Sequence, residues 1–127
     1  GKGFLDEAGI PETPPAWLSE EDIAHYAGVF RRTGFRGGLN WYRNLDRNWA
    51  LTAPWQDAKI APPALFIAGS RDGVISGPLG EARLKEMDGQ IADLRGKLIL
   101  EGAGHWIQQE RAAEVNQALL AFLAQVR

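Results

Sequence analysis

The sequence lacks several features that would define a function class. It contains no cysteine, which excludes disulfides and thiolate metal sites and fits a reducing, cytoplasmic compartment. No apolar run approaches the roughly 18 residues of a membrane span, and residues 1–4 lack the apolar core of a signal peptide. The net charge is −2 and no basic stripe is present, so nucleic-acid binding has no electrostatic support. These absences leave a soluble, metal-free globular chain as the expectation.

The features that are present are ordinary for such a chain, with one exception. The 127 residues are 45% hydrophobic and 24% charged, which suits one small globular domain. Five tryptophans are many for this length, and large aromatic side chains suit either a core or a buried apolar pocket.

The first half of the chain is predicted to be helical after a loop. Residues 1–17 are rich in proline and glycine and predict the loop. The next segment predicts a helix from Ser19 to Arg32, because Ser19 and Asp22 form a capping-box pattern and Gly34 stops it. A second helix is predicted from about Leu39 to Leu51, weakened by three asparagines.

The second half predicts an α/β unit. Residues 64–68 and 97–101 are short apolar strands, followed by helices near 78–87 and from about 110 to 126. The order strand–helix–strand–helix favours two parallel strands, with the first buried on both faces. Two parallel strands cannot cover their own faces and edges, so we expect further strands to be supplied from elsewhere.

An acid and a histidine follow these two strands. Asp72 lies in the turn after the first strand, and His105 lies between glycine and tryptophan after the second. Functional groups of open α/β sheets lie beyond the carboxyl ends of strands, so the two side chains are candidate members of a catalytic triad. Each taken alone also fits a turn residue or a structural histidine. His25, on the first helix, is expected to be solvated.

No nucleophile completes the triad within the chain. Such a residue needs a sharp turn between an apolar strand and a helix. Asp6, Asp22 and Asp46 lack the preceding strand. The sequence therefore predicts the back half of an enzyme.

Three segments together resemble the α/β-hydrolase-fold epoxide hydrolases. They are Phe35–Asn44, which contains Asn-Trp-Tyr-Arg, the turn Ser70–Val74, and Gly104-His105-Trp106. The resemblance extends from about Trp17 to Phe122. It implies an α/β fold class in which residues 1–57 end a helical cap and residues 58–127 form the C-terminal part of the α/β-hydrolase core, with parallel strands and flanking helices.

The resemblance also implies roles for individual residues. Tyr42 corresponds to one of two cap tyrosines that protonate the epoxide oxygen, Asp72 to the charge-relay acid and His105 to the base that activates water. Trp41 and Trp106 are expected to line the substrate pocket. The substrate would be a small apolar epoxide, which an aspartate opens to an alkyl-enzyme ester that water hydrolyses to a vicinal diol. No metal or organic cofactor takes part.

The same resemblance predicts a partner for the chain, and alternative functions remain open. The aspartate, the oxyanion-hole loop and the other cap tyrosine would belong to an N-terminal half of the same enzyme, and a homodimer is left open. Gly37-Gly38 stands where the family often has Gly-Pro. Haloalkane dehalogenases and serine esterases share the histidine turn, and a non-catalytic association module is an alternative from another class.

Overall fold

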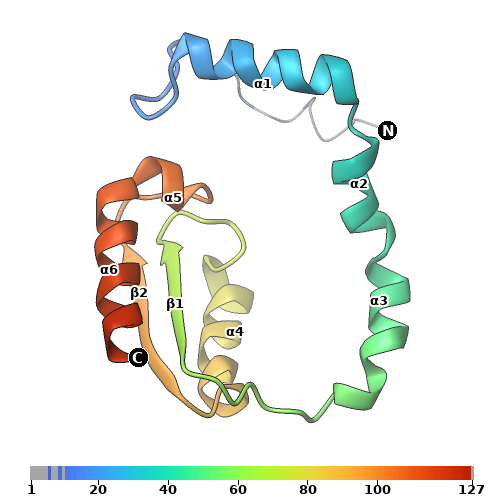
Figure 1. The fold of residues 1–127 in the computed structure, drawn as a ribbon, viewed down its shortest axis with the longest axis vertical. Helices are drawn as coiled ribbons and strands as arrows, with labels where there is room; N and C mark the ends of the chain where they lie inside the picture. The colour runs from blue at the N-terminus through green and yellow to red at the C-terminus, as the bar shows by residue number, and fades with distance from the viewer. Residues whose placement is uncertain (1–5, 7–8, 10, 127) are drawn as a thin grey trace. The chain divides into compact units, whose positions relative to one another are not determined.

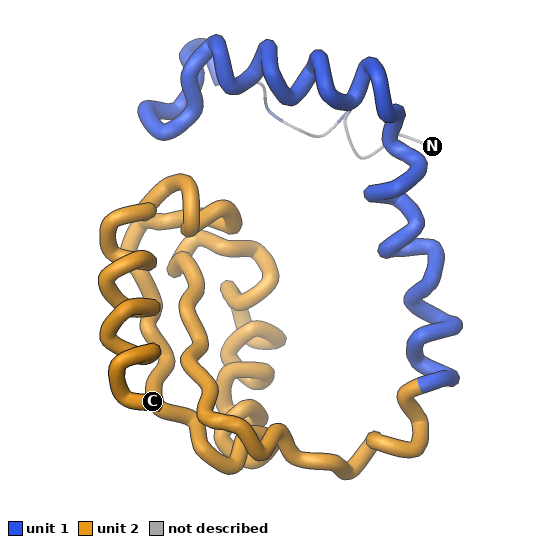
Figure 2. Tube along the Cα trace, viewed as in Figure 1, with its two compact units in different colours: residues 1–51 blue, residues 52–127 orange. Residues whose placement is uncertain are grey.

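The computed structural model describes residues 6, 9 and 11–126. The chain forms two compact units, residues 1–51 and residues 52–127 (Figure 2). The predicted boundary between a cap portion and a core portion lies after residue 57. Whether the two units are these two portions stays a prediction.

The first unit is built from helices. They are α1 (Glu20–Thr33), α2 (Arg36–Arg43) and α3 (Leu45–Thr52), whose last residue begins the second unit (Figure 1). The capping box predicted for the first helix is confirmed. The backbone N–H of Asp22 donates to Ser19 Oγ at 3.1 Å, and the backbone N–H of Ser19 donates to Asp22 Oδ2 at 2.9 Å. These bonds satisfy two donors that the first turn of a helix leaves free.

The single helix predicted over residues 39–51 is wrong, because Asn44 divides it. The backbone of Asn44 leaves the helical region, with φ −94° and ψ 2°. Its side-chain amide donates to the carbonyl of Asn40 at 2.7 Å. This side chain competes for a carbonyl that the helix backbone uses, which is the usual reason that asparagine ends helices. The first of the two helices also starts earlier than predicted, at Arg36.

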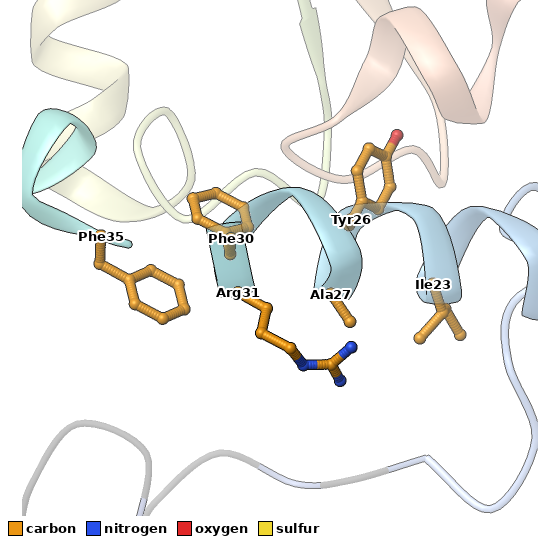
Figure 3. A pocket seen from close by; sticks show the side chains of 6 residues that line it. All are labelled: Ile23, Tyr26, Ala27, Phe30, Arg31 and Phe35. Atoms are coloured by element: carbon orange, nitrogen blue, oxygen red, sulfur yellow. The ribbon is translucent and has the colours of Figure 1, made fainter. Parts of the chain in front are cut away.

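Helix α1 carries an exposed apolar face. A shallow groove of about 490 Å³ runs along it and onto the residue before α2 (Figure 3). The rings of Phe30 and Phe35 stack at 4.7 Å between centroids, with 10° between their planes. This contact joins the end of α1 to the start of α2. The groove is lined by Ile23, Tyr26, Ala27, Phe30, Arg31 and Phe35.

The second unit is a two-stranded parallel sheet with helices beside it (Figure 1). The strands pair regularly from Leu65 to Gly69, with Ile67 opposite Leu98, and the register shifts by one residue between Ala64 and Leu65. The parallel pairing confirms the predicted α/β arrangement. Lys97 of β2 (Leu94–Leu100) connects α4 (Gly77–Gln90) to the sheet, since its ammonium group donates to the carbonyl of Leu84 and pairs with Asp88 at 2.8 Å. In chain order the elements are η2 (Ala53–Trp55), β1 (Ala64–Gly69), α4 (Gly77–Gln90), β2 (Leu94–Leu100), α5 (Ile107–Glu110) and α6 (Ala112–Gln125).

Several predicted boundaries in this unit are wrong. Strand β2 starts three residues earlier than residue 97 and ends before Glu101, and α4 continues beyond 87 to Gln90. The final helix, predicted from about 110 to 126, is α6 and begins two residues later, at Ala112. The short helix α5, which ends at Glu110, was not predicted, and Arg111 between the two helices is not helical, with φ −136° and ψ 47°. The Arg111 guanidinium donates to the carbonyl of Glu101 at 3.2 Å. A long-range contact accompanies this break, and local propensity does not report such contacts.

The expectation that the first strand is buried on both faces is also wrong for this chain. Only Ala68 and Gly69 of β1 are buried, and residues 64–67 are half-exposed. The described sheet has two strands, so each strand has one neighbour and one open edge. The core therefore lies near the carboxyl ends of the strands, where Ala103, Ile107 and Val115 are buried against Ile67 and Leu100.

At Gly69 the end of β1 lies close to the backbone of the loop that follows β2. A Cβ at this position would lie 2.3 Å from the carbonyl oxygen of Ala103 and 2.4 Å from that of Gly104. Backbone atoms cannot yield as the end of a side chain can. The absence of a side chain at Gly69 therefore lets the loop after β2 pack directly on the end of β1.

We expect Gly69→Ala to lower the free energy of unfolding by about 2–3 kcal/mol, because overpacking of this kind forces backbone shifts. Denaturant unfolding of the protein measures the change. Gly73→Ala is the matched control, since nothing lies within 4 Å of a Cβ there. Its effect should stay within about 0.5 kcal/mol. Equal changes in the two variants would contradict the close approach.

Candidate active site

Asp72 is placed by the turn that follows β1. Its backbone N–H donates to the carbonyl of Gly69 at 3.1 Å. Its own carbonyl accepts the N–H groups of Ile75 and Ser76 at 3.1 and 2.9 Å. These bonds fix the backbone on both sides of the residue. Asp72 is 9% exposed, and among the residues that the structure describes it is the one charged residue that is buried.

The carboxylate of Asp72 has one partner on each oxygen. Oδ1 accepts the backbone N–H of Val74 at 2.8 Å, and Oδ2 lies 2.9 Å from Nδ1 of His105. The bond from Val74 lowers the pKa of Asp72 most. Desolvation raises the pKa by less than this bond lowers it, and the bond from His105 lowers it by a still smaller amount, so the pKa lies below its usual value. Asp72 is therefore ionised throughout the pH range in which an imidazole is neutral.

An ionised Asp72 fixes the state of the His105 ring. Because the carboxylate can only accept hydrogen bonds, Nδ1 of the neutral ring must carry the proton. The lone pair is then on Nε2. The His105 side chain is 60% exposed, whereas that of Asp72 is 11% exposed. The arrangement is that of a base oriented from behind by an acid, with its free nitrogen accessible.

The two loops that carry these side chains are bonded to each other. Ser70 is central to this contact, because its Oγ accepts the N–H of Gly102 at 2.9 Å and its N–H donates to the carbonyl of Leu100 at 3.0 Å. The N–H of Arg71 donates to the carbonyl of Ala103 at 2.9 Å. Residues 33 apart in the sequence thus meet on a shared backbone frame.

A second acid, Glu110, also holds the loop that carries His105. The Glu110 carboxylate accepts the N–H of Gly104 at 2.7 Å and the N–H of Trp106 at 3.0 Å. Sequence reasoning misses this residue. The available signal is its position in the first turn after Trp106, the N-cap of α5, where acids often reach back to backbone N–H groups.

A hollow of about 470 Å³ adjoins the Asp72–His105 pair within the second unit. Its walls come mainly from apolar side chains of β1, α5 and α6, and both members of the pair reach it. Trp106 does not line this hollow, is 53% exposed and meets the His105 ring edge-on at 5.4 Å. The lining residues are Leu65, Phe66, Ile67, Ala68, Asp72, Val74, Ile75, His105, Ile107, Gln108, Val115 and Leu119.

The other predicted site residues belong to the first unit. Trp41 and Tyr42 are neighbours on α2, so their side chains leave the helix about 100° apart. They are 79% and 73% exposed. His25 is exposed on α1, as expected. The structure thus joins Asp72 to His105, and the parts predicted for Trp41, Tyr42 and Trp106 stay predictions.

Nearly the whole chain is similar in sequence and in structure to known epoxide hydrolases. Epoxide hydrolase A of Mycobacterium tuberculosis is 47% identical over 121 residues, which is 95% of this chain and 36% of that protein. Epoxide hydrolase 1 of Siraitia grosvenorii is 42% identical over 97% of this chain and 40% of its own length. The crystal structure of epoxide hydrolase A from Mycobacterium thermoresistibile covers the whole chain at 48% identity and a TM-score of 0.90.

The chain is homologous to the epoxide hydrolases of α/β-hydrolase fold. This confirms both the family resemblance and the fold class predicted from the sequence. The chain spans little more than a third of the length of the relatives it matches, and it corresponds to their C-terminal part. No family model matches it.

Two kinds of feature are absent from the described residues of this epoxide hydrolase homologue. Within residues 6, 9 and 11–126, no three His, Cys, Asp or Glu residues form a group that could hold a metal ion. In the same part of the chain, no helix combines the length and the apolar character that crossing a bilayer requires.

Proposed function

We propose that this chain is the C-terminal part of an epoxide hydrolase that converts apolar epoxides to vicinal diols through an alkyl-enzyme ester. The hydrogen bond between Asp72 and His105, in a chain homologous to epoxide hydrolases, carries the proposal. Residues 1–57 would end the cap and residues 58–127 would complete the core.

An N-terminal half must supply the nucleophile in this proposal. The matched region leaves most of the length of the relatives uncovered. No aspartate of this chain follows an apolar strand as a nucleophile elbow requires, except Asp72, which is bonded to His105. An aspartate carboxylate of that half attacks an epoxide carbon, and the ring C–O bond breaks. Tyr42 donates its phenol proton to the departing oxygen, which leaves a β-hydroxyalkyl ester.

The second step uses the pair described above. Nε2 of His105 takes a proton from water, and the resulting hydroxide adds to the ester carbonyl carbon. The bond between that carbon and the alkyl oxygen then breaks, and the imidazolium returns its proton to the leaving oxygen. The products are the vicinal diol and the carboxylic acid of the nucleophile, whose proton passes to the Tyr42 phenolate left by the first step, so that both the carboxylate and the phenol are restored. Asp72 stabilises the imidazolium while it exists.

The apolar character of the proposed substrate follows from the groups around the pair. The hollow beside Asp72 and His105 is walled largely by apolar side chains. We also assign Trp41 and Trp106 to the substrate pocket, by resemblance to the family. An apolar wall of this kind binds hydrocarbon and leaves polar contacts to the reacting oxygen.

A substrate panel tests the proposal against its rivals. The complete enzyme, with its N-terminal half, is incubated with an aryl epoxide, a primary haloalkane and a p-nitrophenyl ester. We expect diol from the epoxide as the dominant activity. Halide release or ester cleavage without diol would favour a haloalkane dehalogenase or an esterase, and no reaction would favour an association module.

Oxygen-18 water provides an internal check on the mechanism. With enzyme in excess over epoxide, the first diol should be unlabelled, because its new oxygen comes from the carboxylate. Under multiple turnover the label should enter the diol. Label in the first diol would show direct attack of water and overturn the ester mechanism.

A further inference from the structure

The Glu110 carboxylate accepts the backbone N–H groups of the two residues on either side of His105 in the sequence. Its Oε2 accepts the N–H of Gly104 at 2.7 Å, and its Oε1 accepts the N–H of Trp106 at 3.0 Å. The backbone N–H of Glu110 also donates to the carbonyl of Trp106 at 2.9 Å. The histidine is therefore the central residue of a loop closed by one acid.

Gly104 leaves the room that this carboxylate occupies. A Cβ on Gly104 would lie 2.9 Å from Oε1 and 3.3 Å from Oε2 of Glu110. The first distance is shorter than real Cβ contacts show, so any other residue would displace the carboxylate. The glycine before the histidine therefore makes room for the Glu110 carboxylate and also allows the turn.

Glu110 is itself anchored to the core. It ends α5, which begins with the buried Ile107 at 8% exposure. The next residue, Arg111, donates to the carbonyl of Glu101, where β2 ends. The loop is therefore tied at its start by Arg111 and around its histidine by Glu110, with Ala103 between them at 1% exposure.

We propose that Glu110 is a positioning residue, which holds the backbone of His105 so that Nδ1 meets Asp72 and Nε2 is directed at the water of the second step. The inference rests on the proposed function. Two hydrogen bonds to an ionised acceptor are stronger than neutral ones, and groups that act in catalysis must be held within about 0.5 Å. The His105 side chain is exposed and has one hydrogen bond of its own, to Asp72. The remaining restraint on the orientation of the imidazole ring must therefore come from the backbone of His105.

The test separates the two half-reactions in the complete enzyme. After rapid mixing of excess enzyme with an aryl epoxide, quenched samples are analysed by intact-protein mass spectrometry, which follows the alkyl-enzyme ester as it forms and decays. Glu110→Gln retains one acceptor oxygen, and Glu110→Ala retains none. We expect ester decay to slow about 10-fold and about 100-fold, the latter being the usual cost of a 1 Å misplacement. Ester formation should change less than about threefold, since His105 takes no part in it.

Two further variants complete the design. Gly104→Ala keeps the acid but displaces it, and should also slow decay selectively. Glu114→Gln alters the next acid along the chain, whose carboxylate bonds to Arg111 at 3.4 Å, and should leave both steps unchanged. Decay of the ester is a unimolecular step in enzyme that has already folded and reacted. A smaller folded fraction could therefore slow ester formation, but it cannot imitate a selective slowing of decay.

The outcomes distinguish this inference from the proposed function. Unchanged ester decay in Glu110→Ala, or an equal slowing of both steps, would overturn the positioning role while the wild-type enzyme still makes diol. A wild-type enzyme that forms neither ester nor diol would overturn the proposed function and this inference with it.

Discussion

His105→Gln is expected to lower kcat for epoxide hydration by about 1,000-fold or more, near the upper end of what general-base catalysis contributes. Glutamine can still bond to Asp72, but it has no basic nitrogen to take a proton from water. Ring opening does not need that base. The alkyl-enzyme ester should therefore form at close to the normal rate and then accumulate, giving a burst of epoxide consumption near one equivalent per active site.

The measurement is the covalent mass increase on the nucleophile half, together with the time course of diol release. His25→Gln is the matched control, because the chain has two histidines and this one is exposed on α1. It should turn over normally and accumulate nothing. If His105→Gln released diol at the wild-type rate, His105 would not be the base.

Tyr42→Phe should reduce kcat/KM about 100-fold, or about 2.7 kcal/mol, the usual loss when one preorganised donor to a developing oxyanion is removed. The effect belongs to the first step, because the phenol donates to the oxygen that leaves the ring. The second cap tyrosine expected in the N-terminal half would retain part of the activity. No ester should accumulate, which is the opposite of the histidine variant.

Tyr26→Phe provides the comparison, since the chain has two tyrosines and Tyr26 lies in the groove along α1. Single-turnover rates of ester formation should fall in Tyr42→Phe alone. Should epoxide turnover be unchanged in Tyr42→Phe, the assignment would lose its acid, and a dehalogenase or esterase of the same fold would become the better proposal.

Local rules predicted those elements whose cause lies within a few residues. The start of α1 follows from Ser19 and Asp22, three residues apart, because the capping box is closed by their own side chains and backbones. Strand β1 follows from an unbroken apolar run that ends at Gly69. The parallel pairing of β1 and β2 followed from the strand–helix–strand order, which is itself a property of the chain.

Other features depend on contacts that no short window contains. The break at Arg111 accompanies a hydrogen bond to Glu101, ten residues away. The exposure of β1 depends on how many strands lie beside it, and the sequence of β1 alone does not predict that number. Glu110 was missed as a site residue because its partners are backbone N–H groups, whose positions are defined only in the folded loop.

The sequence by itself determined the chemistry available, namely an acid and an imidazole after two apolar strands, and the family that the chain resembles. The tertiary structure decided that this acid and this imidazole meet at 2.9 Å. It also decided that a second acid, Glu110, holds the loop that carries the imidazole. The physical reason is that residue type fixes what a group can donate or accept. Distance and direction arise only when backbones far apart in the chain are bonded together.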